Sequence, residues 1–275
     1  MRRVWLSLVC MLVAAPASAT WSVVALDQRT GTVVIASATC VAGEALTRFG
    51  GSNPNGLMGI QAIVVPGIGV AAAQAGVDQT RANQMLIYRE IQKGTDPAAI
   101  IELLKADPRI ESRQFGILDM QGRMAGFSGS RNGAVSLHAF GQVEGQPIFY
   151  AIQGNILTSE AVVQEAVKAF TATSGTLSDR VMAAMEAADA QGGDSRCSCD
   201  NPRNPPVAAA TCSNKTAHVA YILRAEKTDP VGESHNDGKY AFFLSVTDQD
   251  ITAGEDANPV KTLRMRYDAS MRSGG

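Results

Sequence analysis

Apolar residues along this chain gather in short runs that are typical of β-strands, and glycine-containing turns join these runs in pairs. The turn Gln28–Gly31, for example, separates two valine-rich runs, which predicts a β-hairpin. Three hairpins are predicted in this way: Thr20–Asp27 with Thr32–Thr39, Gly59–Val65 with Gly69–Gln74, and Ser112–Asp119 with Arg123–Ser128. Because a hairpin joins antiparallel strands, we expect antiparallel sheets rather than a doubly wound parallel fold.

Helical patterns lie between the strand pairs. Asp78 precedes apolar residues spaced as on one face of a helix, and Asp96 followed by Pro97 is typical of a helix start. The other predicted elements are the helices Ser159–Thr173, Leu177–Ala190 and Pro259–Ser270 and the strands Phe149–Leu157, Ala208–Leu223 and Tyr240–Thr247. Two antiparallel sheets with helices packed outside them would bury these apolar runs, so the predicted fold class is α+β.

The N-terminal segment has the three parts of a secretory signal peptide. Arg2 and Arg3 form a charged start, Val4–Ala15 is a short apolar run, and an Ala-x-Ala sequence ends at Ala19. The apolar run is shorter than the roughly 20 residues that span a bilayer. We therefore expect cleavage after Ala19, a periplasmic or secreted mature protein that begins at Thr20, and no membrane association after cleavage.

Export would place the remaining cysteines in an oxidising compartment, where an even number is typical of disulfides. A bridge between Cys197 and Cys199 would strain the bond geometry. We therefore expect Cys40 to pair with one of these two and Cys212 with the other. The alternative is a zinc site formed by the three late cysteines and His218, although their spacing is not the usual one for zinc.

The composition and the sequence motifs argue against some classes of ligand and binding partner. The chain of 275 residues has a net charge of −2, and 18% of its residues are charged. No basic cluster of the kind that binds nucleic acid is present. A G-x-G-x-x-A sequence at Gly67–Ala72 falls on a predicted hairpin turn instead of a strand–helix junction, so it does not indicate a dinucleotide site. We expect no cofactor, no metal and no nucleic-acid partner.

Cleavage after Ala19 would have a chemical consequence. A free N-terminal threonine carries a hydroxyl nucleophile and also a base, because its α-amine has a pKa near 7.7–8.0. In the precursor the same nitrogen is an amide and cannot accept the hydroxyl proton. Thr20 is therefore a candidate catalytic nucleophile. The alternative is a polar residue that signal cleavage happens to leave at the start of a strand.

Several stretches of the chain carry a family resemblance: Thr20–Ala25, Gly69–Gln74, Arg113–Asp119 with Gly122–Arg123, Tyr150–Leu157, and Gly192–Asp194. Together they resemble a bacterial family of unknown function, DUF1028, that is similar to N-terminal-nucleophile (Ntn) hydrolases. The resemblance covers about residues 20–223 and implies a four-layer αββα sandwich, but no known substrate. The expected organisation is a signal peptide (1–19), an Ntn-hydrolase-like domain (20–225) and a C-terminal extension with a strand and a helix (226–275).

Two further side chains are candidate site residues. Asn155 ends a predicted strand, where its amide and backbone N–H groups can form an oxyanion hole; the alternative is a turn residue that bonds its own backbone. Asp194 follows two glycines and could either orient the site or cap a loop. Gln74 is expected to satisfy backbone groups between strands.

One feature of the related peptidases is missing, because the first lysine after Thr20 is Lys93. In the peptidase branch of the superfamily, an aspartate and a lysine usually flank the N-terminal threonine. The charged residues near the expected places are Asp27, Arg29, Glu44 and Arg48. Our first hypothesis is an exported amidohydrolase that acts on a small amide or peptide-like substrate. The alternative, favoured by the missing lysine and the acidic tail, is a non-catalytic binding or assembly protein of unknown oligomeric state on the same fold.

Overall fold

The computed structural model describes residues 20–46, 55–197 and 215–273, so the predicted signal peptide, Arg48, Cys199 and Cys212 lie outside the described residues. The strands are β1 (Thr20–Asp27), β2 (Thr32–Thr39), β3 (Ala62–Val65), β4 (Gly69–Ala75), β5 (Arg113–Asp119), β6 (Met124–Ser128), β7 (Ser136–Gln142), β8 (Ile148–Asn155), β9 (Val219–Ala225) and β10 (Phe242–Thr247). The helices are α1 (Gly43–Leu46), α2 (Gly56–Gln61), α3 (Ala82–Gln92), α4 (Pro97–Leu104), the 3₁₀ helix η1 (Ile110–Ser112), α5 (Ala161–Ala172), α6 (Leu177–Ala190) and α7 (Pro259–Ser273).

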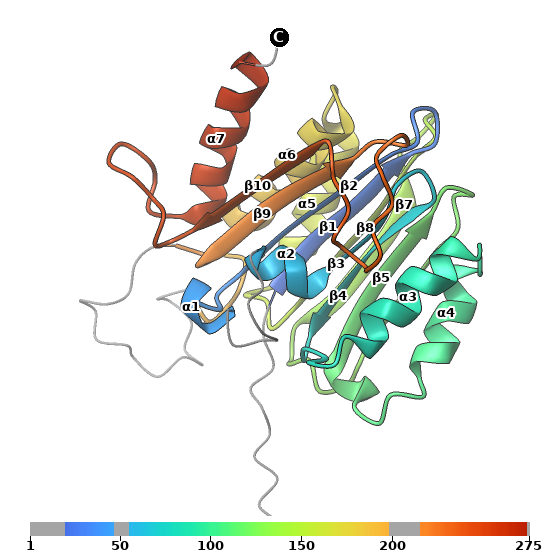
Figure 1. Ribbon diagram of the computed structural model, residues 1–275. Coiled ribbons are helices and arrows are strands. Elements are labelled where there is room, and N and C mark those ends of the chain that lie inside the picture. Colours follow the sequence, from blue (N-terminus) through green and yellow to red (C-terminus); the bar gives the residue numbers. More distant parts are fainter. Residues whose placement is uncertain (1–19, 47–54, 198–214, 274–275) are drawn as a thin grey trace, which may run out of the picture.

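These strands form two antiparallel sheets that stack face to face (Figure 1). The six-stranded sheet has the order β10-β9-β2-β1-β8-β7, and the four-stranded sheet has the order β3-β4-β5-β6. Helices α5 and α6 pack on the outer face of the larger sheet, with α7 against β9 and β10, while α3 and α4 cover the outer face of the smaller sheet. This arrangement confirms the predicted α+β fold with four αββα layers.

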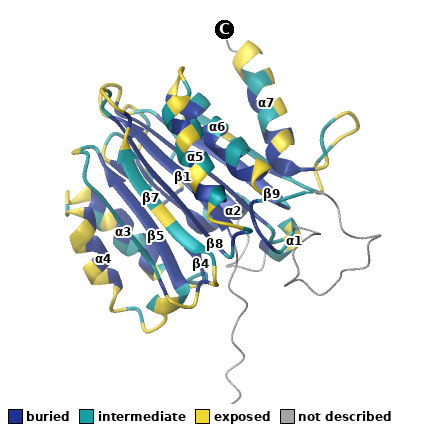
Figure 2. Ribbon diagram, turned by 180° about the vertical axis from the view of Figure 1, so that it is seen from behind, coloured by how far each residue is buried: buried dark blue, intermediate teal, exposed yellow. Residues whose placement is uncertain are grey.

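Strand β1 lies at the centre of the molecule and is buried on both faces (Figure 2). Its residues Trp21 and Val23 belong to the hydrophobic cluster under α5 and α6, whereas Val24 and Leu26 belong to the cluster between the sheets. Successive side chains of a strand point to opposite faces. Thr20 therefore faces the space between the two sheets, on the same side of β1 as Val24.

The three predicted hairpins are confirmed, and β1 and β2 have the predicted bounds. One predicted strand is wrong in part, because Gly59–Val65 begins as the end of helix α2 and only Ala62–Val65 is extended. The apolar residues Leu57, Met58 and Ile60 are buried in α2. A short apolar run fits a buried helix as well as a buried strand, which explains the error.

Strand β7 was not predicted, and it lies at the edge of the larger sheet next to β8. Its residues are half-buried or exposed along its whole length. An edge strand that packs on one side only does not need a continuous apolar run. The sequence Ser136–Gln142, which contains serine, histidine and glycine, therefore carries little strand signal.

The C-terminal extension contains the expected strand and helix, and the strand β10 pairs with β9 in the larger sheet. The loop between β9 and β10 crosses to the smaller sheet, where Val64 N–H donates to the His235 carbonyl at 2.8 Å. The side-chain amide of Asn236 donates to the carbonyls of Met58 and Ala62 at 3.0 and 3.2 Å. Burial lowers the pKa of His235 to about 4, so its imidazole is neutral at pH 7.

No helix in the described part of the chain is both long enough and apolar enough to cross a membrane.

Candidate functional site

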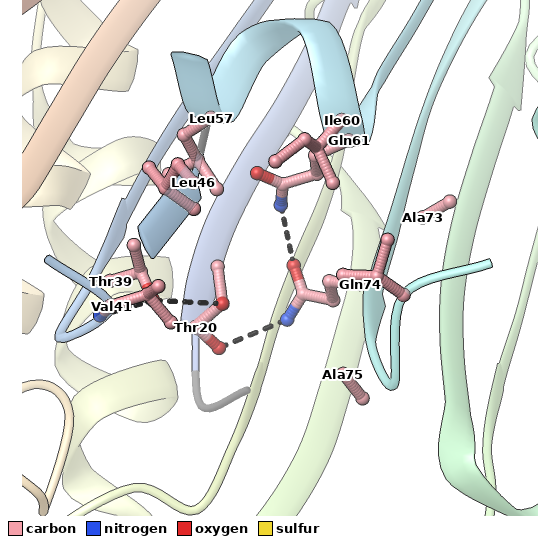
Figure 3. Close-up of a pocket in the computed structure, with 11 residues that line it drawn as sticks. Thr20, Thr39, Val41, Leu46, Leu57, Ile60, Gln61, Ala73, Gln74 and Ala75 are labelled. Atoms are coloured by element: carbon pink, nitrogen blue, oxygen red, sulfur yellow. Dashed lines mark hydrogen bonds between the residues drawn. The ribbon is translucent and has the colours of Figure 1, made fainter. Parts of the chain in front are cut away.

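A pocket with a cavity volume of about 20 Å³ lies where β1 begins, between the two sheets (Figure 3). Its polar lining residues are Thr20, Thr39, Gln61 and Gln74. The remaining lining residues are apolar: Val41, Leu46, Leu57, Ile60, Ala73, Ala75 and Val77. None of these described lining residues has a charged side chain.

Thr20 is the first residue of β1 and only 3% exposed. Its hydroxyl donates to the hydroxyl of Thr39, its neighbour on β2, over 3.3 Å. The backbone carbonyl of Thr20 accepts a hydrogen bond of 3.0 Å from the side-chain amide of Gln74 on β4. Thr20 is thus held from both sheets, and the prediction that Gln74 satisfies a backbone group is confirmed.

Three buried glutamines from three elements form a chain of hydrogen bonds behind Thr20. Gln61 of α2 donates to the amide oxygen of Gln74 at 2.8 Å, and Gln74 donates to the amide oxygen of Gln114 on β5 at 2.7 Å. Gln114 in turn donates to the carbonyl of Gly154 on β8 at 3.0 Å. This series of hydrogen bonds therefore runs from the wall of the pocket back to the larger sheet. The sequence indicated only its middle member, because the three glutamines are far apart along the chain.

The predicted site residue Asn155 lies directly beside Thr20. The two residues are register partners in the pairing of β1 with β8, and Asn155 is completely buried. Gln153, two residues earlier on β8, reaches the Ala72 carbonyl of the smaller sheet at 3.4 Å. Because residues two apart share a face of a strand, Asn155 and Thr20 face the same side. The structure therefore places Thr39, Thr20 and Asn155 on one face of three neighbouring strands.

Asp194 has a different environment. Its carboxylate accepts a hydrogen bond of 2.8 Å from Cys40 N–H and forms an ion pair of 2.7 Å with Arg196. It also accepts from the backbone N–H of Arg196 at 3.0 Å. Asp194 is completely buried, but it does not line the Thr20 pocket. These contacts are those of a residue that fixes a loop to the end of β2, which is the second of the two predicted roles.

The charged residues noted near Thr20 in the sequence do not enter the described pocket lining. Asp27 and Arg29 form an ion pair of 3.0 Å at the opposite end of β1. Burial alone would raise the pKa of Asp27, but hydrogen bonds and charge from Arg29 outweigh it and lower that pKa. Glu44 is exposed on α1.

A disulfide joins Cys40, next to Thr39, to Cys197, and the two Cα atoms are 5.7 Å apart. This confirms that Cys40 pairs with one of the two expected cysteines. It also removes Cys197 from the zinc site considered as the alternative. The expected pairing of Cys199 with Cys212 falls outside the described residues. The bridge ties the end of β2 to the segment that carries Asp194.

Reduction of this disulfide is expected to lower the free energy of unfolding by about 2–4 kcal/mol, because the bridge closes a loop of 157 residues. The measurement is urea unfolding of the mature protein with and without reductant. The variant Cys40→Ser should show the same loss in the absence of reductant, where the expected Cys199–Cys212 pair stays intact. Equal stability of the oxidised and reduced proteins would contradict the assigned bridge.

Comparison with known proteins identifies the family of this chain and a solved structure with a similar fold. The family of unknown function DUF1028 matches residues 20–231. The crystal structure of a DUF1028 protein from Silicibacter pomeroyi superposes with a TM-score of 0.62 at 20% sequence identity, covering 92% of this chain and 90% of that one. No curated protein matches. At this identity the superposition supports the fold alone, whereas the family match spans most of the chain. The chain belongs to the DUF1028 family.

Proposed function

We propose that this protein is exported and acts as an Ntn-type amidohydrolase whose nucleophile is the hydroxyl of Thr20. One observation carries the proposal: the Thr20 hydroxyl lines a pocket in which no described residue has an ionisable side chain. A threonine hydroxyl needs a base to become nucleophilic. The described lining offers no such side chain, so we assign the base to the main chain: removal of residues 1–19 would supply it as the α-amine of Thr20.

The reaction would proceed in two steps. The Thr20 hydroxyl attacks the amide carbonyl while the α-amine accepts its proton, and the amine then returns this proton to the leaving nitrogen. Water then attacks the resulting ester while the α-amine accepts a proton from the water. The amine returns this proton to the Thr20 oxygen as that oxygen leaves. The side-chain amide of Asn155, beside Thr20 on the same face, is our candidate for stabilising the oxyanion. We assign Asp194 a supporting role at the end of β2, where its carboxylate accepts from Cys40 N–H.

The surroundings of Thr20 support a preorganised site. The side-chain nitrogen of Gln74 donates to the Thr20 carbonyl. The side-chain oxygen of Gln74 accepts a hydrogen bond of 2.7 Å from the hydroxyl of Ser22, which lies on β1 with Thr20. A nucleophile held in one position loses little entropy on reaching the transition state. The Ntn-like sequence stretches and the four-layer sandwich also favour this function, and the disulfide is typical of an oxidising compartment.

Activity of the mature protein on a small uncharged amide is expected to rise with pH and to level off above about 8. The base is active only when deprotonated, and a free α-amine has a pKa near 7.7–8.0. The measurement is kcat/KM across pH 5.5–9.5. The variant Thr20→Ser should keep the same midpoint, because its amine is unchanged.

Mass spectrometry of the same preparation, made by export of the full precursor from a bacterial host, should show Thr20 as the first residue. A different first residue would overturn the proposal, because the α-amine would then belong to another position. A rate that does not change between pH 6 and 9 would also contradict an amine base.

A second candidate function is non-catalytic binding. It is favoured by the hydrogen bond that already engages the Thr20 hydroxyl with Thr39 and by the apolar character of the pocket. This alternative predicts that the mature protein binds small uncharged ligands in the pocket but turns over none of a broad panel of amides.

A further inference from the structure

We infer that the Thr20 pocket selects an uncharged group that carries an N–H or O–H donor, and that the amide oxygen of Gln61 recognises this donor. The inference deepens the proposed function. It rests on that function only in treating the selected group as part of an amide substrate. Binding itself does not depend on catalysis. Selection depends on which end of the Gln61 amide faces the pocket.

The orientation of the Gln74 amide is fixed by a backbone group. Its neighbour at 3.0 Å is the carbonyl of Thr20, which can only accept a hydrogen bond. The nitrogen of the Gln74 amide must therefore face Thr20, and its oxygen must face the opposite side. There the oxygen accepts from the hydroxyl of Ser22 at 2.7 Å, which agrees with this orientation.

The hydrogen bonds of Gln114, at the other end of the series of three glutamines, independently require the same orientation of the Gln74 amide. The nitrogen of the Gln114 amide lies 3.0 Å from the Gly154 carbonyl and 3.3 Å from the Leu137 carbonyl, both of which are acceptors. The oxygen of Gln114 must then face Gln74 and accept from the Gln74 nitrogen at 2.7 Å. Two sets of backbone carbonyls thus impose one direction on the whole chain of amides.

This direction decides what Gln61 offers to the pocket. Because Gln61 has to donate its nitrogen to the oxygen of Gln74, its own oxygen faces away from Gln74. Figure 3 shows this oxygen on the side of the pocket formed by Leu46 and Leu57. Gln61 is 1% exposed, and no group in the described part of the chain donates to its oxygen.

A buried acceptor without a donor is costly, so a ligand that supplies the donor gains affinity. The rest of the described lining is aliphatic apart from Thr20, Thr39 and Gln74, and none of it is charged. A carboxylate would lose its hydration, would find no cationic side chain in the described lining and would face the Gln61 oxygen. The favoured occupant is therefore a small neutral group such as a primary carboxamide or an alcohol.

The test compares three ligands with side chains of similar size: the N-acetyl 4-nitroanilides of asparagine, leucine and aspartate. Their binding is measured by calorimetry on the mature Thr20→Ala protein at about pH 9, where a free α-amine with a pKa near 7.7–8.0 is mostly neutral, and their turnover on the mature protein with Thr20 intact. Gln61→Met removes the acceptor but leaves Ser22 to donate to Gln74. Gln84→Met is the matched control, because Gln84 is also buried with an unpaired amide oxygen but does not line the described pocket.

We expect the ratio of asparagine to leucine affinities to fall about tenfold in Gln61→Met and to remain unchanged in Gln84→Met, with the aspartate ligand bound most weakly. If the ligands bind with this pattern but are not turned over, the hydrolase proposal is wrong and the inference still holds. Turnover with an unchanged ratio in Gln61→Met would overturn the inference alone. The inference is also overturned if none of the ligands binds at millimolar concentration or if aspartate binds best.

Discussion

Replacement of Thr20 by alanine is expected to reduce amide turnover by roughly a thousandfold or more while leaving the fold intact. The loss follows because the attacking oxygen is removed, whereas the side chain at the start of β1 contributes one hydrogen bond, of 3.3 Å, to the structure. Turnover is measured with the mature protein, and thermal unfolding shows whether the fold persists. Thr20→Ser should retain part of the activity, since its hydroxyl and α-amine both remain.

One additional residue in front of Thr20 should be as damaging as Thr20→Ala. The addition leaves the hydroxyl in place but converts the α-amine into an amide, which is not a base. A hydrolase that takes its base from a side chain would be little affected by this change. If the extended protein works at the normal rate, the base is not the amine and the proposed mechanism is wrong.

A large effect on stability is also expected at Gln114, where replacement by leucine should lower the free energy of unfolding by about 3 kcal/mol. Leucine leaves the carbonyl of Gly154 and the amide nitrogen of Gln74 short of a partner in a completely buried position. Urea unfolding measures the loss. Gln164→Leu on the exposed face of α5 is the control and should change stability by less than about 0.5 kcal/mol.

A loss at Gln114 no larger than that at Gln164 would show that the chain of amides adds little to stability. The same variant should also weaken pocket binding, since the direction of the Gln61 amide depends on both ends of the chain. This coupling can be checked with the ligands used for Gln61.

Much of the fold could be predicted because its signals are local. The hairpin of β1 and β2 is encoded by two valine-rich runs around a turn with Gly31 at φ 74°, a conformation that glycine adopts easily. Helix α4 begins at Pro97 after Asp96, whose carboxylate accepts from Ala98 N–H as its position predicts. In both cases neighbouring residues determine the structure without help from the rest of the chain.

The parts of the site that were not predicted depend on contacts between distant segments. Helix α2 brings Gln61 to a glutamine of β4, and that contact exists only after the sheets have stacked. The choice of Cys197 over Cys199 as the partner of Cys40 is equally a matter of three-dimensional placement. The contact of Asp194 with the backbone of Cys40 likewise joins segments that lie far apart along the chain. A hydrophobic pattern contains no information on such pairings.

The family match ends at residue 231, but the folded unit continues beyond it. Strand β10 covers the outer edge of β9, and the loop with His235 occupies the Val64 N–H on the edge strand β3. A chain that stopped at the family boundary would leave both edges with open hydrogen-bonding groups, which are templates for the addition of a strand from another molecule. The tail thus fills the hydrogen-bonding edge of β9 and one position on β3, and it makes β10 the edge strand of the larger sheet.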